Sequence, residues 1–332
     1  MEALNTQEFD LARLPRGVKQ TGWLDVAPRP EGSTWRLPFL YVTGKAQGPV
    51  LVVTAGVHGD EYEGVEAIPG VFRDTDPRSL KGTLFMIPVC NIPAFETITR
   101  SSPIDGLNLA RTFPGNGSGS ITERIAHLIA TQILPDADFY IDLHSGGMMY
   151  DIPTLVGYLH DDGDLGVRSL AGARAFGAPV LWGHPLPVAP GRTLSSAVDH
   201  DVPCIYTEAS GGGLARPDDV ACFRNGVLNV MKSLDMIDGN PQPSPTVLHL
   251  FGDGNIDQAI LAQSAGYYKP EVELLDEVRS DQLLGTIRDL LGEVVSEVRA
   301  PTDGVVIMLR RFHSVRVGDG LAHITKRHIT DR

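Results

Sequence analysis

The stretch Pro49-Val-Leu-Val-Val-Thr-Ala-Gly-Val-His-Gly-Asp-Glu61 joins an apolar run to a polar turn. The nearly unbroken apolar run over residues 49–54 is typical of a strand that is covered on both faces of a parallel sheet. The turn after this strand carries the imidazole of His58 and, three residues later, the carboxylate of Glu61. Both groups bind zinc, and a turn at a strand end can aim both at one point. His58 and Glu61 are therefore candidate metal ligands, with an ordinary surface turn as the alternative.

A second predicted strand ends in the same way. Residues 137–143, Ala-Asp-Phe-Tyr-Ile-Asp-Leu, are followed directly by His144 and then by Ser-Gly-Gly. Two histidines and one glutamate form the three-ligand set of a catalytic zinc, which leaves a fourth position for water. We therefore predict one zinc ion per chain on His58, Glu61 and His144. Asp142 shares a strand face with His144, where it either orients that imidazole or is simply a buried, hydrogen-bonded carboxylate.

A third predicted strand, residues 203–207, ends at Glu208. Hydrolysis of an amide needs a base that takes a proton from water and returns it to the leaving nitrogen. Glu208 is the candidate for this role, and the alternative is a salt-bridged surface carboxylate. In open α/β sheets, ligands bind beyond the carboxyl ends of the strands. His58, His144 and Glu208 are all predicted at that edge, which is stronger support than any single motif.

The order of the predicted elements indicates the fold class. Strands alternate with helices through most of the chain, which predicts an α/β three-layer sandwich with a mostly parallel mixed sheet. Residues 238–245 are typical of a linker, and the short β-rich runs beyond it predict a small C-terminal all-β domain. We therefore expect a catalytic domain over residues 1–240 and a β-rich domain over 246–332. Helices are predicted over residues 61–72, 120–134, 164–176, 194–198 and 217–236.

Three local features refine this expectation. Residues 1–35 are turn-rich, so short irregular strands are predicted there. Pro69-Gly70 is expected to interrupt or end the first helix. Ser120 and Glu123 fit a capping box at the start of the 120–134 helix.

A long segment, residues 91–119, lacks periodicity and is rich in Asn, Pro, Gly and Ser. A loop of this length in a compact domain is usually functional. Its two arginines, Arg100 and Arg111, are candidates to stabilise a developing oxyanion and to grip a substrate carboxylate. A solvated surface charge is the alternative for each. His184, in Trp-Gly-His-Pro, is a further candidate substrate contact.

Composition excludes some classes of partner. The 332 residues carry a formal charge of −13, which argues against a nucleic-acid backbone as the partner. Cys90, Cys204 and Cys222 lie in apolar surroundings and are predicted to be thiols of a reducing compartment. The N-terminal residues show no signal sequence, and no apolar stretch is long enough to span a membrane. We expect a cytoplasmic protein with no membrane partner; a homo-oligomer is left open.

Four motifs together resemble one family. The motifs are Gly56-Val-His-Gly-Asp-Glu61, the loop 105–115, Asp142-Leu-His-Ser-Gly-Gly147 and Thr207-Glu-Ala-Ser210. They resemble the succinylglutamate desuccinylase/aspartoacylase family of zinc carboxypeptidase-like hydrolases, over roughly residues 45–235. The β-rich tail is also similar to that family's C-terminal domain.

This resemblance implies a role for each candidate residue. It implies zinc on His58, Glu61 and His144. It also implies that Glu208 acts as general base and acid, that Arg100 stabilises the oxyanion, and that Arg111 and Asn108 bind substrate.

One departure concerns the substrate. The family commonly reads Asn-Leu-Asn-Arg, whereas Ala110 precedes Arg111 here, so an amide that would share the substrate carboxylate is missing. We therefore expect the family's reaction on a different substrate; a deacetylase of the N-acetyl-diaminobutyrate type is one alternative within the family. The leading hypothesis is a zinc amidohydrolase that removes an acyl group from a small N-acyl amino acid or related amine.

Other classes remain as alternatives. They are a metallocarboxypeptidase acting on peptides, a non-catalytic metal-binding member of the fold, and a serine hydrolase. The last would use Ser145 or Ser210, although neither lies in G-x-S-x-G.

Overall fold

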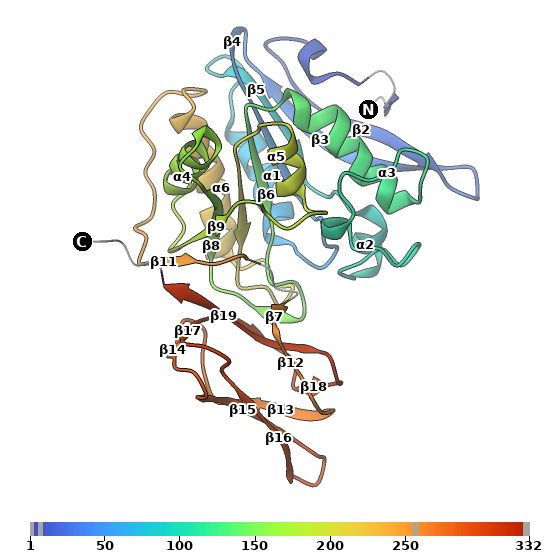
Figure 1. Cartoon of the computed structure of the whole chain (residues 1–332). Helices are drawn as coiled ribbons and strands as arrows, with labels where there is room; N and C mark the ends of the chain where they lie inside the picture. The colour runs from blue at the N-terminus through green and yellow to red at the C-terminus, as the bar shows by residue number, and fades with distance from the viewer. Residues whose placement is uncertain (1–2, 6–8, 255–257, 328–332) are drawn as a thin grey trace.

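The computed structural model describes residues 3–5, 9–254 and 258–327. Within these residues the chain forms one large mixed sheet and a separate four-stranded antiparallel sheet near the C-terminus (Figure 1). This confirms the predicted α/β fold with a mixed sheet and a C-terminal β region. The strands of the large sheet are β1 (Ala3–Asn5), β2 (Lys19–Pro28), β3 (Thr34–Thr43), β4 (Ala46–Ala55), β5 (Lys81–Ile87), β6 (Phe139–Leu143), β7 (Tyr150–Asp151), β8 (Leu155–His160), β9 (Val180–Pro185), β10 (Cys204–Glu208), β11 (Leu248–Phe251), β12 (Ile260–Leu261), β14 (Glu277–Val278), β17 (Gly304–Arg310) and β19 (Gly320–Arg327). The small sheet contains β13 (Gly266–Pro270), β15 (Leu283–Arg288), β16 (Val294–Arg299) and β18 (Ser314–Val315).

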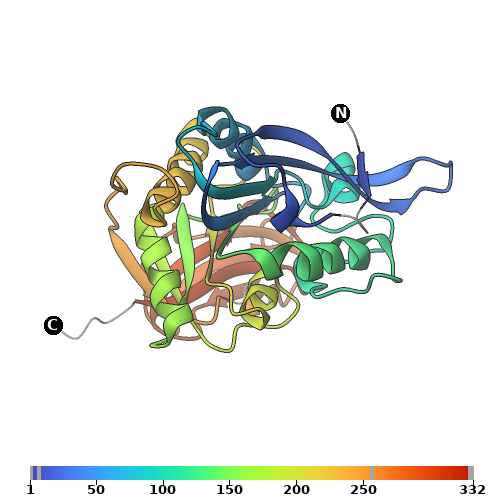
Figure 2. The ribbon, with the colours of Figure 1, turned by 90° about the horizontal axis from the view of Figure 1, so that it is seen from above.

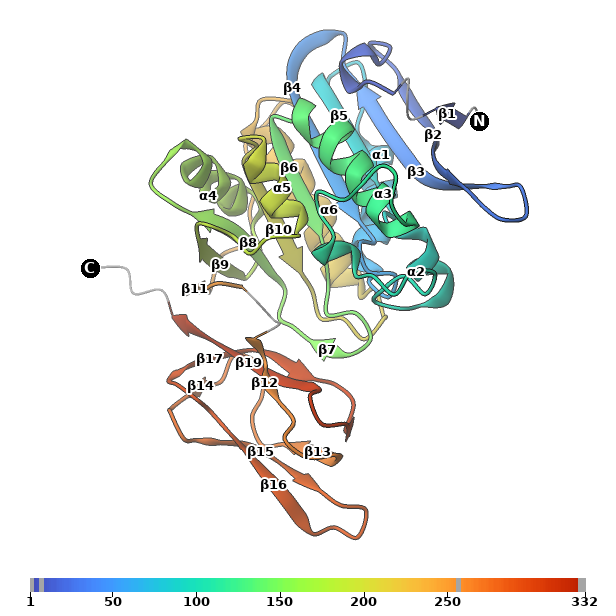
Figure 3. The same ribbon diagram turned by 45° about the vertical axis from the view of Figure 1, so that its right-hand side comes forward.

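Helices cover both faces of the central strands. They are α1 (Glu63–Asp74), α2 (Ile92–Thr97), α3 (Ile121–Leu128), α4 (Asp164–Phe176), α5 (Thr193–Asp199) and α6 (Pro217–Ser233). Figure 3 shows α3 and α5 in front of β4 and β6, with α6 behind them. Alternate residues of one strand face opposite cores, because Val52 packs with the α3 and α5 side whereas Val53 packs with α1, α4 and α6. This two-sided burial explains why the 49–54 run is apolar throughout.

Three adjacent strands at the centre of the sheet run parallel. β6 pairs with β4 on one side, where Leu143 is opposite Ala55, and with β10 on the other, where Leu143 is opposite Thr207. Their carboxyl ends therefore lie side by side at one edge of the sheet. The segments that follow β4 and β6, and the last residue of β10, are the ones that carry His58, His144 and Glu208.

The structure differs from the sequence expectation in four places. Helix α1 continues through Pro69 to Asp74, because its buried stripe, which includes Ile68 and Val71, packs on the sheet and outweighs the lost backbone hydrogen bond. The segment 91–119 is not wholly irregular, since it contains α2 and a 3₁₀ turn at Leu109–Arg111. Residues 19–28 form the long strand β2, in place of short irregular strands, and β2 pairs with β3 as a hairpin that projects sideways in Figure 2.

The fourth difference is at the capping-box helix. α3 begins after Ser120, and the Glu123 carboxylate accepts the Ser120 N–H at 2.8 Å. The α-helical bonding ends at Leu128, however, and the chain continues as a π-helical turn over Ile129–Ile133.

The C-terminal strands are hydrogen-bonded to the central sheet. β11 pairs in parallel with β9 and antiparallel with β19, and β17 pairs with both β19 and β7. A small apolar cluster that includes Trp182, Leu250 and Ile307 fills this junction. The division at residues 240 and 246 stays a prediction, and the pairing shows that β11 extends the central sheet.

Two further expectations can be compared with the structure. Among residues 3–5, 9–254 and 258–327, no helix has the length and apolar character needed to cross a lipid bilayer. Cys90, Cys204 and Cys222 are free thiols; the first two are buried and the third is partly buried.

Candidate active site

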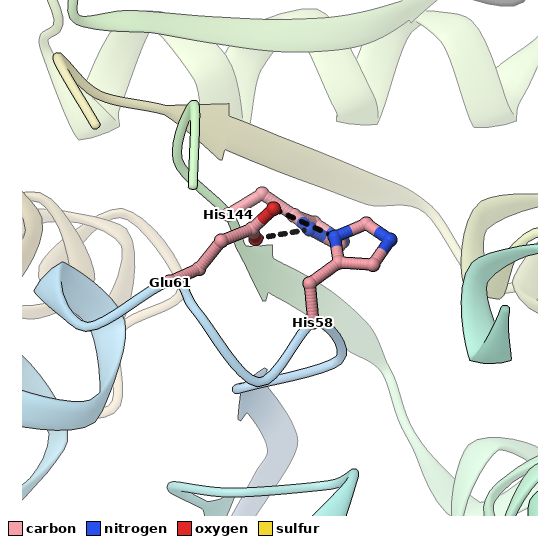
Figure 4. A group of neighbouring side chains, drawn as sticks. All are labelled: His58, Glu61 and His144. Atoms are coloured by element: carbon pink, nitrogen blue, oxygen red, sulfur yellow. Dashed lines mark hydrogen bonds and ion pairs between the residues drawn. The ribbon is translucent and has the colours of Figure 1, made fainter. Parts of the chain in front are cut away.

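The three predicted metal ligands converge (Figure 4). His58 Nδ1 lies 2.6 Å from Glu61 Oε1, and His144 Nδ1 lies 2.8 Å from Glu61 Oε2. The two imidazole rings are 5.1 Å apart between centroids. In the part of the chain that the structure describes, this is the one group of three or more His, Cys, Asp and Glu side chains placed to hold a metal ion. The two strand-end motifs therefore form a single site.

Close packing of two loops shapes the turn that carries His58. The backbone N–H groups of Cys90 and Asn91 donate to Ala55 and Gly56, so the segment after β5 continues alongside the end of β4. At Gly59 this approach is so close that an added Cβ would overlap the backbone of Ala94. Glycine is therefore required between His58 and Glu61, because a side chain there would push the turn away from α2.

The hydrogen bonds of His58 indicate which nitrogen is available to a metal. Asn108 Oδ1 accepts the Ala110 N–H at 3.0 Å, which fixes it as an acceptor, and it lies 3.1 Å from His58 Nε2. His58 therefore donates from Nε2 and presents a lone pair at Nδ1. That lone pair faces the Glu61 carboxylate, so two hydrogen-bond acceptors lie against each other. A cation between His58 Nδ1 and Glu61 would stabilise this arrangement. Arg100 Nη1 lies 3.2 Å from His58 Nδ1 and 3.2 Å from Glu61 Oε1.

His144 is held from its other side by Asp142. His144 Nε2 lies 3.0 Å from Asp142 Oδ2, which also accepts the Thr193 hydroxyl at 2.5 Å, while Asp142 Oδ1 accepts the Thr54 hydroxyl at 2.7 Å. Asp142 is fully buried. Both interpretations of Asp142 apply. It is a buried, hydrogen-bonded carboxylate, and it orients the His144 imidazole with Nδ1 toward Glu61. An imidazole bound in this way by a carboxylate is the usual arrangement of a metal-ligating histidine.

Burial and nearby charges shift the pKa values of this cluster in different directions. Burial, followed by the Arg100 guanidinium, lowers the pKa of His58 to about 4. Burial opposes the charged forms of Glu61 and His144, yet the imidazoles hold the pKa of Glu61 well below its usual range, and Asp142 and Glu61 raise the pKa of His144 well above its usual range. Two carboxylates around one imidazole favour a positive charge at this point. The donor set and its charge thus fit a divalent cation.

Glu208 lies in the same pocket as His58 and His144. The residue is half-buried, and its Oε2 atom is shielded from solvent with no hydrogen-bond partner in the described structure. Burial, and then repulsion from Glu61, raise its pKa to about 8. A buried carboxylate oxygen without a partner, beside a candidate metal-binding cluster, is suited to exchanging protons with a reacting group.

The pocket contains both predicted arginines. It has a volume of about 840 Å³, its open mouth included, and Arg100, Arg111 and His184 are among its lining residues; their roles toward a substrate stay predictions. Asn108 is not among the lining residues, since its side chain contacts His58, so a direct role in substrate binding stays a prediction.

Several lining residues were not identified from the sequence. Trp182, Arg192 and Tyr206 come from the α/β part of the chain, whereas Asp253 and the pair Ile307 and Met308 come from the segments after residue 246. No motif marks them; the spacing of Tyr206 two residues before Glu208 was the one available signal.

Comparison with known proteins identifies the family of this chain. Residues 47–234 match the succinylglutamate desuccinylase/aspartoacylase catalytic domain, which is more than half of the chain. The chain belongs to this family. It is also 32% identical, over 92% of its length and 91% of the relative's, to an N-alpha-acetyl-L-2,4-diaminobutyric acid deacetylase of Halomonas elongata. The family and this relative support amide-bond hydrolysis by a deacylase.

Solved structures of the family share the whole fold. A succinylglutamate desuccinylase/aspartoacylase from Rhodobacter sphaeroides superposes with a TM-score of 0.86 at 28% identity, covering 97% of this chain and 98% of that one. The product-bound ectoine utilization protein EutE (DoeB) from Ruegeria pomeroyi also gives 0.86 at 28% identity, with 95% and 98% covered. The similarity of this desuccinylase/aspartoacylase family member to its relatives therefore includes the C-terminal β region.

Proposed function

We propose that the chain is a zinc-dependent deacylase that hydrolyses the amide bond of a small N-acyl amino acid or related amine. The observation that carries this proposal is the convergence of His58, Glu61 and His144 at a pocket that is also lined by Glu208, whose Oε2 atom has no hydrogen-bond partner. His, His and Glu are the ligand set of several catalytic zinc sites. Zinc on these ligands would supply a Lewis acid that activates water and polarises the amide carbonyl.

The protein's own groups would carry the proton and bind the substrate. Glu208 takes a proton from the attacking water and returns it to the leaving amine nitrogen, so the carboxylate is regenerated in each turnover. Arg100, beside Glu61 and His58, can donate to the oxygen on which negative charge develops. Arg111 can bind a substrate carboxylate through its planar guanidinium.

The walls of the pocket favour a small substrate over a peptide. Ile307 and Met308 of β17 and Asp253 after β11 line the same pocket as the catalytic cluster. The C-terminal region therefore borders the site, and a metallocarboxypeptidase would have to pass a peptide chain through this border. The relative from Halomonas elongata acts on an N-acetylated diamino acid, which is a substrate of the expected size.

Metal content and turnover together test the proposal. We expect about one zinc ion per purified chain, its loss in His144→Ala, and release of acetate from a panel of N-acetyl amino acids. Glu208→Gln should keep zinc and lose several orders of magnitude in kcat, because it removes the proton carrier and leaves the ligands. Full turnover in Glu208→Gln, or absence of zinc after supplementation, would refute the mechanism. Zinc binding without any hydrolysis by wild type would indicate a non-catalytic member of the fold.

A further inference from the structure

The sheet face beneath α5 brings together the polar side chains that surround Asp142. Thr54 on β4 is directly opposite Asp142 on β6 in the parallel pairing, and Tyr140 lies two residues earlier on the same face. Helix α5 covers this face, since its residue Ala197 packs in the same apolar core as Tyr140 (Figure 3). Thr193, the first residue of α5, meets the carboxylate from above the sheet.

The hydrogen bonds around Asp142 run toward its carboxylate. The Thr54 hydroxyl donates to Oδ1 at 2.7 Å, and the Thr193 hydroxyl donates to Oδ2 at 2.5 Å. His144 Nε2 lies 3.0 Å from the same Oδ2 atom. The Tyr140 hydroxyl lies 2.5 Å from Thr54 Oγ1 and must donate to it, because the hydrogen of Thr54 is used by Asp142.

This arrangement fixes the orientation of the carboxylate that holds His144. One hydroxyl from β4 and one from α5 bind different oxygens of Asp142, which opposes rotation about its Cβ–Cγ bond. Without Thr193, Oδ2 would contact only the imidazole that it orients. Asp142 and Thr54 are fully buried and Thr193 is 3% exposed, so water has little access to replace a lost donor.

The alternative role for Thr193 is to begin the helix. Threonine is common at helix N-termini because its oxygen can accept an unpaired backbone N–H group. Here the hydroxyl of Thr193 donates to Asp142, and the first turn of α5 is closed by Ser195, whose Oγ accepts the Arg192 N–H at 3.0 Å. The hydroxyl of Thr193 is therefore directed at the carboxylate and not at the helix backbone.

The segment that carries Thr193 is also a wall of the pocket. Arg192 and Thr193 both line it. The preceding residue, Gly191, packs against the backbone of Arg111, and its carbonyl accepts the Phe113 N–H at 3.1 Å. Residues 191–193 thus border the space for a substrate on one side and hold Asp142 on the other.

We propose that Thr193 is a positioning residue of the metal centre: its hydroxyl fixes the Asp142 carboxylate, which directs Nδ1 of His144 at the metal. This inference rests on the proposed zinc-dependent function and adds to it a residue that contacts neither the metal nor the reacting atoms. Zinc affinity therefore depends on one hydroxyl in the pocket wall.

Two substitutions separate the hydroxyl from the rest of the side chain. Thr193→Val removes the hydroxyl and keeps the branched shape, whereas Thr193→Ser keeps the hydroxyl. In a competition titration with a chelator, we expect Thr193→Val to weaken zinc binding about tenfold, at the lower end of the effect of removing a group that supports metal ligands. Thr193→Ser should remain within about twofold of wild type, because its hydroxyl can still donate to Asp142.

Kinetics at saturating zinc distinguish positioning from packing of the pocket wall. Because the hydroxyl is used by Asp142, Thr193→Val should leave KM for an N-acetyl amino acid within about twofold of wild type. A threonine that only shapes the wall would give the reverse pattern, with a raised KM and an unchanged zinc affinity.

Thr75→Val is the matched control. Thr75 is also buried, and its hydroxyl donates to the Val71 carbonyl at 2.8 Å, but it follows the C-terminal end of α1 and does not line the pocket. This variant should lower the free energy of unfolding and leave zinc affinity unchanged. A double-mutant cycle adds Thr193→Val to Asp142→Ala, where the hydroxyl has no carboxylate to act through, so zinc affinity should fall by less than about twofold further.

The outcomes separate this inference from the proposed function. Unchanged zinc affinity in Thr193→Val, equal weakening in Thr193→Val and Thr193→Ser, or a full effect of Thr193→Val on top of Asp142→Ala would each overturn it. Zinc binding with the expected pattern but without hydrolysis would uphold the positioning role and refute the deacylase. Hydrolysis by a wild-type zinc protein whose affinity does not depend on Thr193 would do the opposite, and a wild type that binds no zinc would refute the metal centre and this inference with it.

Discussion

The raised pKa of Glu208 predicts that this residue lowers the stability of the metal-free protein at neutral pH. Its folded-state pKa is about 8, against an ordinary value of 4.5. A group whose pKa is raised on folding contributes its stabilisation fully below the unfolded value, and that contribution is lost as the pH rises through the folded value. Metal-free wild type should therefore lose this contribution between about pH 4.5 and pH 8, whereas Glu208→Gln has no such dependence.

The magnitude follows from the two pKa values. Between the two pKa values, the folded chain holds a proton that the unfolded chain releases. Each pH unit in this interval lowers the free energy of unfolding by about 1.4 kcal/mol, so the loss at pH 7 is at most roughly 3 kcal/mol. Glu208 is half-buried, and solvent screens part of this effect. Between pH 5 and pH 8, we therefore expect the free energy of unfolding of metal-free Glu208→Gln to rise relative to that of wild type by about 1–3 kcal/mol.

Urea unfolding of chelator-treated protein at pH 5, 7 and 9 measures this difference. The free energies of unfolding of wild type and Glu208→Gln should diverge as the pH rises. Glu293→Gln, which alters an exposed carboxylate before β16, is the control and should give a curve parallel to wild type. If the curve of Glu208→Gln is also parallel to that of wild type, ionisation of Glu208 does not lower the free energy of unfolding, and the prediction is wrong.

Three further changes test other parts of the site. Asp142→Asn should weaken zinc binding 10- to 100-fold in a competition titration with a chelator, because the His144 imidazole loses its carboxylate partner; unchanged affinity would show that Asp142 is only structural. Arg111→Ala should raise KM by about 10- to 100-fold for N-acetyl amino acids and far less for the matching N-acetyl amines, which lack the carboxylate; equal effects on both would place Arg111 outside substrate binding. Gly59→Ala should cost about 3 kcal/mol or more in thermal unfolding, because its Cβ would overlap the backbone of Ala94; a stable variant with intact zinc binding would show that the turn can move.

The central fold and the cluster of His58, Glu61 and His144 could be predicted because they depend on local sequence. A continuous apolar run identifies a strand buried on two faces, and parallel pairing then brings together the residues that follow each strand. This rule alone was enough to predict that three side chains share one site, those of His58, Glu61 and His144. Glu208 followed from the same rule, since β10 pairs in parallel with β6.

Other features depend on contacts between distant segments. Pro69 remains within α1 because burial of neighbouring residues outweighs a local preference. Asp253 reaches the pocket because β11 joins the edge of the sheet next to β9. The direction of the hydrogen bond between Tyr206 and His184 depends on the tautomer of His184, which is set by the Gly252 carbonyl, 68 residues away along the chain. Sequence periodicity contains no information about such pairings.

The junction of β11, β17 and β19 has a consequence for the newly made chain. All the catalytic candidates lie before residue 209, yet two residues of the pocket wall, Ile307 and Met308, lie on β17, which is held in place by β19. During synthesis the candidate metal ligands and Glu208 therefore emerge from the ribosome long before this part of the pocket wall. A chain that stops between α6 and β17 would contain the candidate catalytic groups and lack this part of the wall. Completion of the C-terminal β region thus determines when the pocket acquires its full set of lining residues.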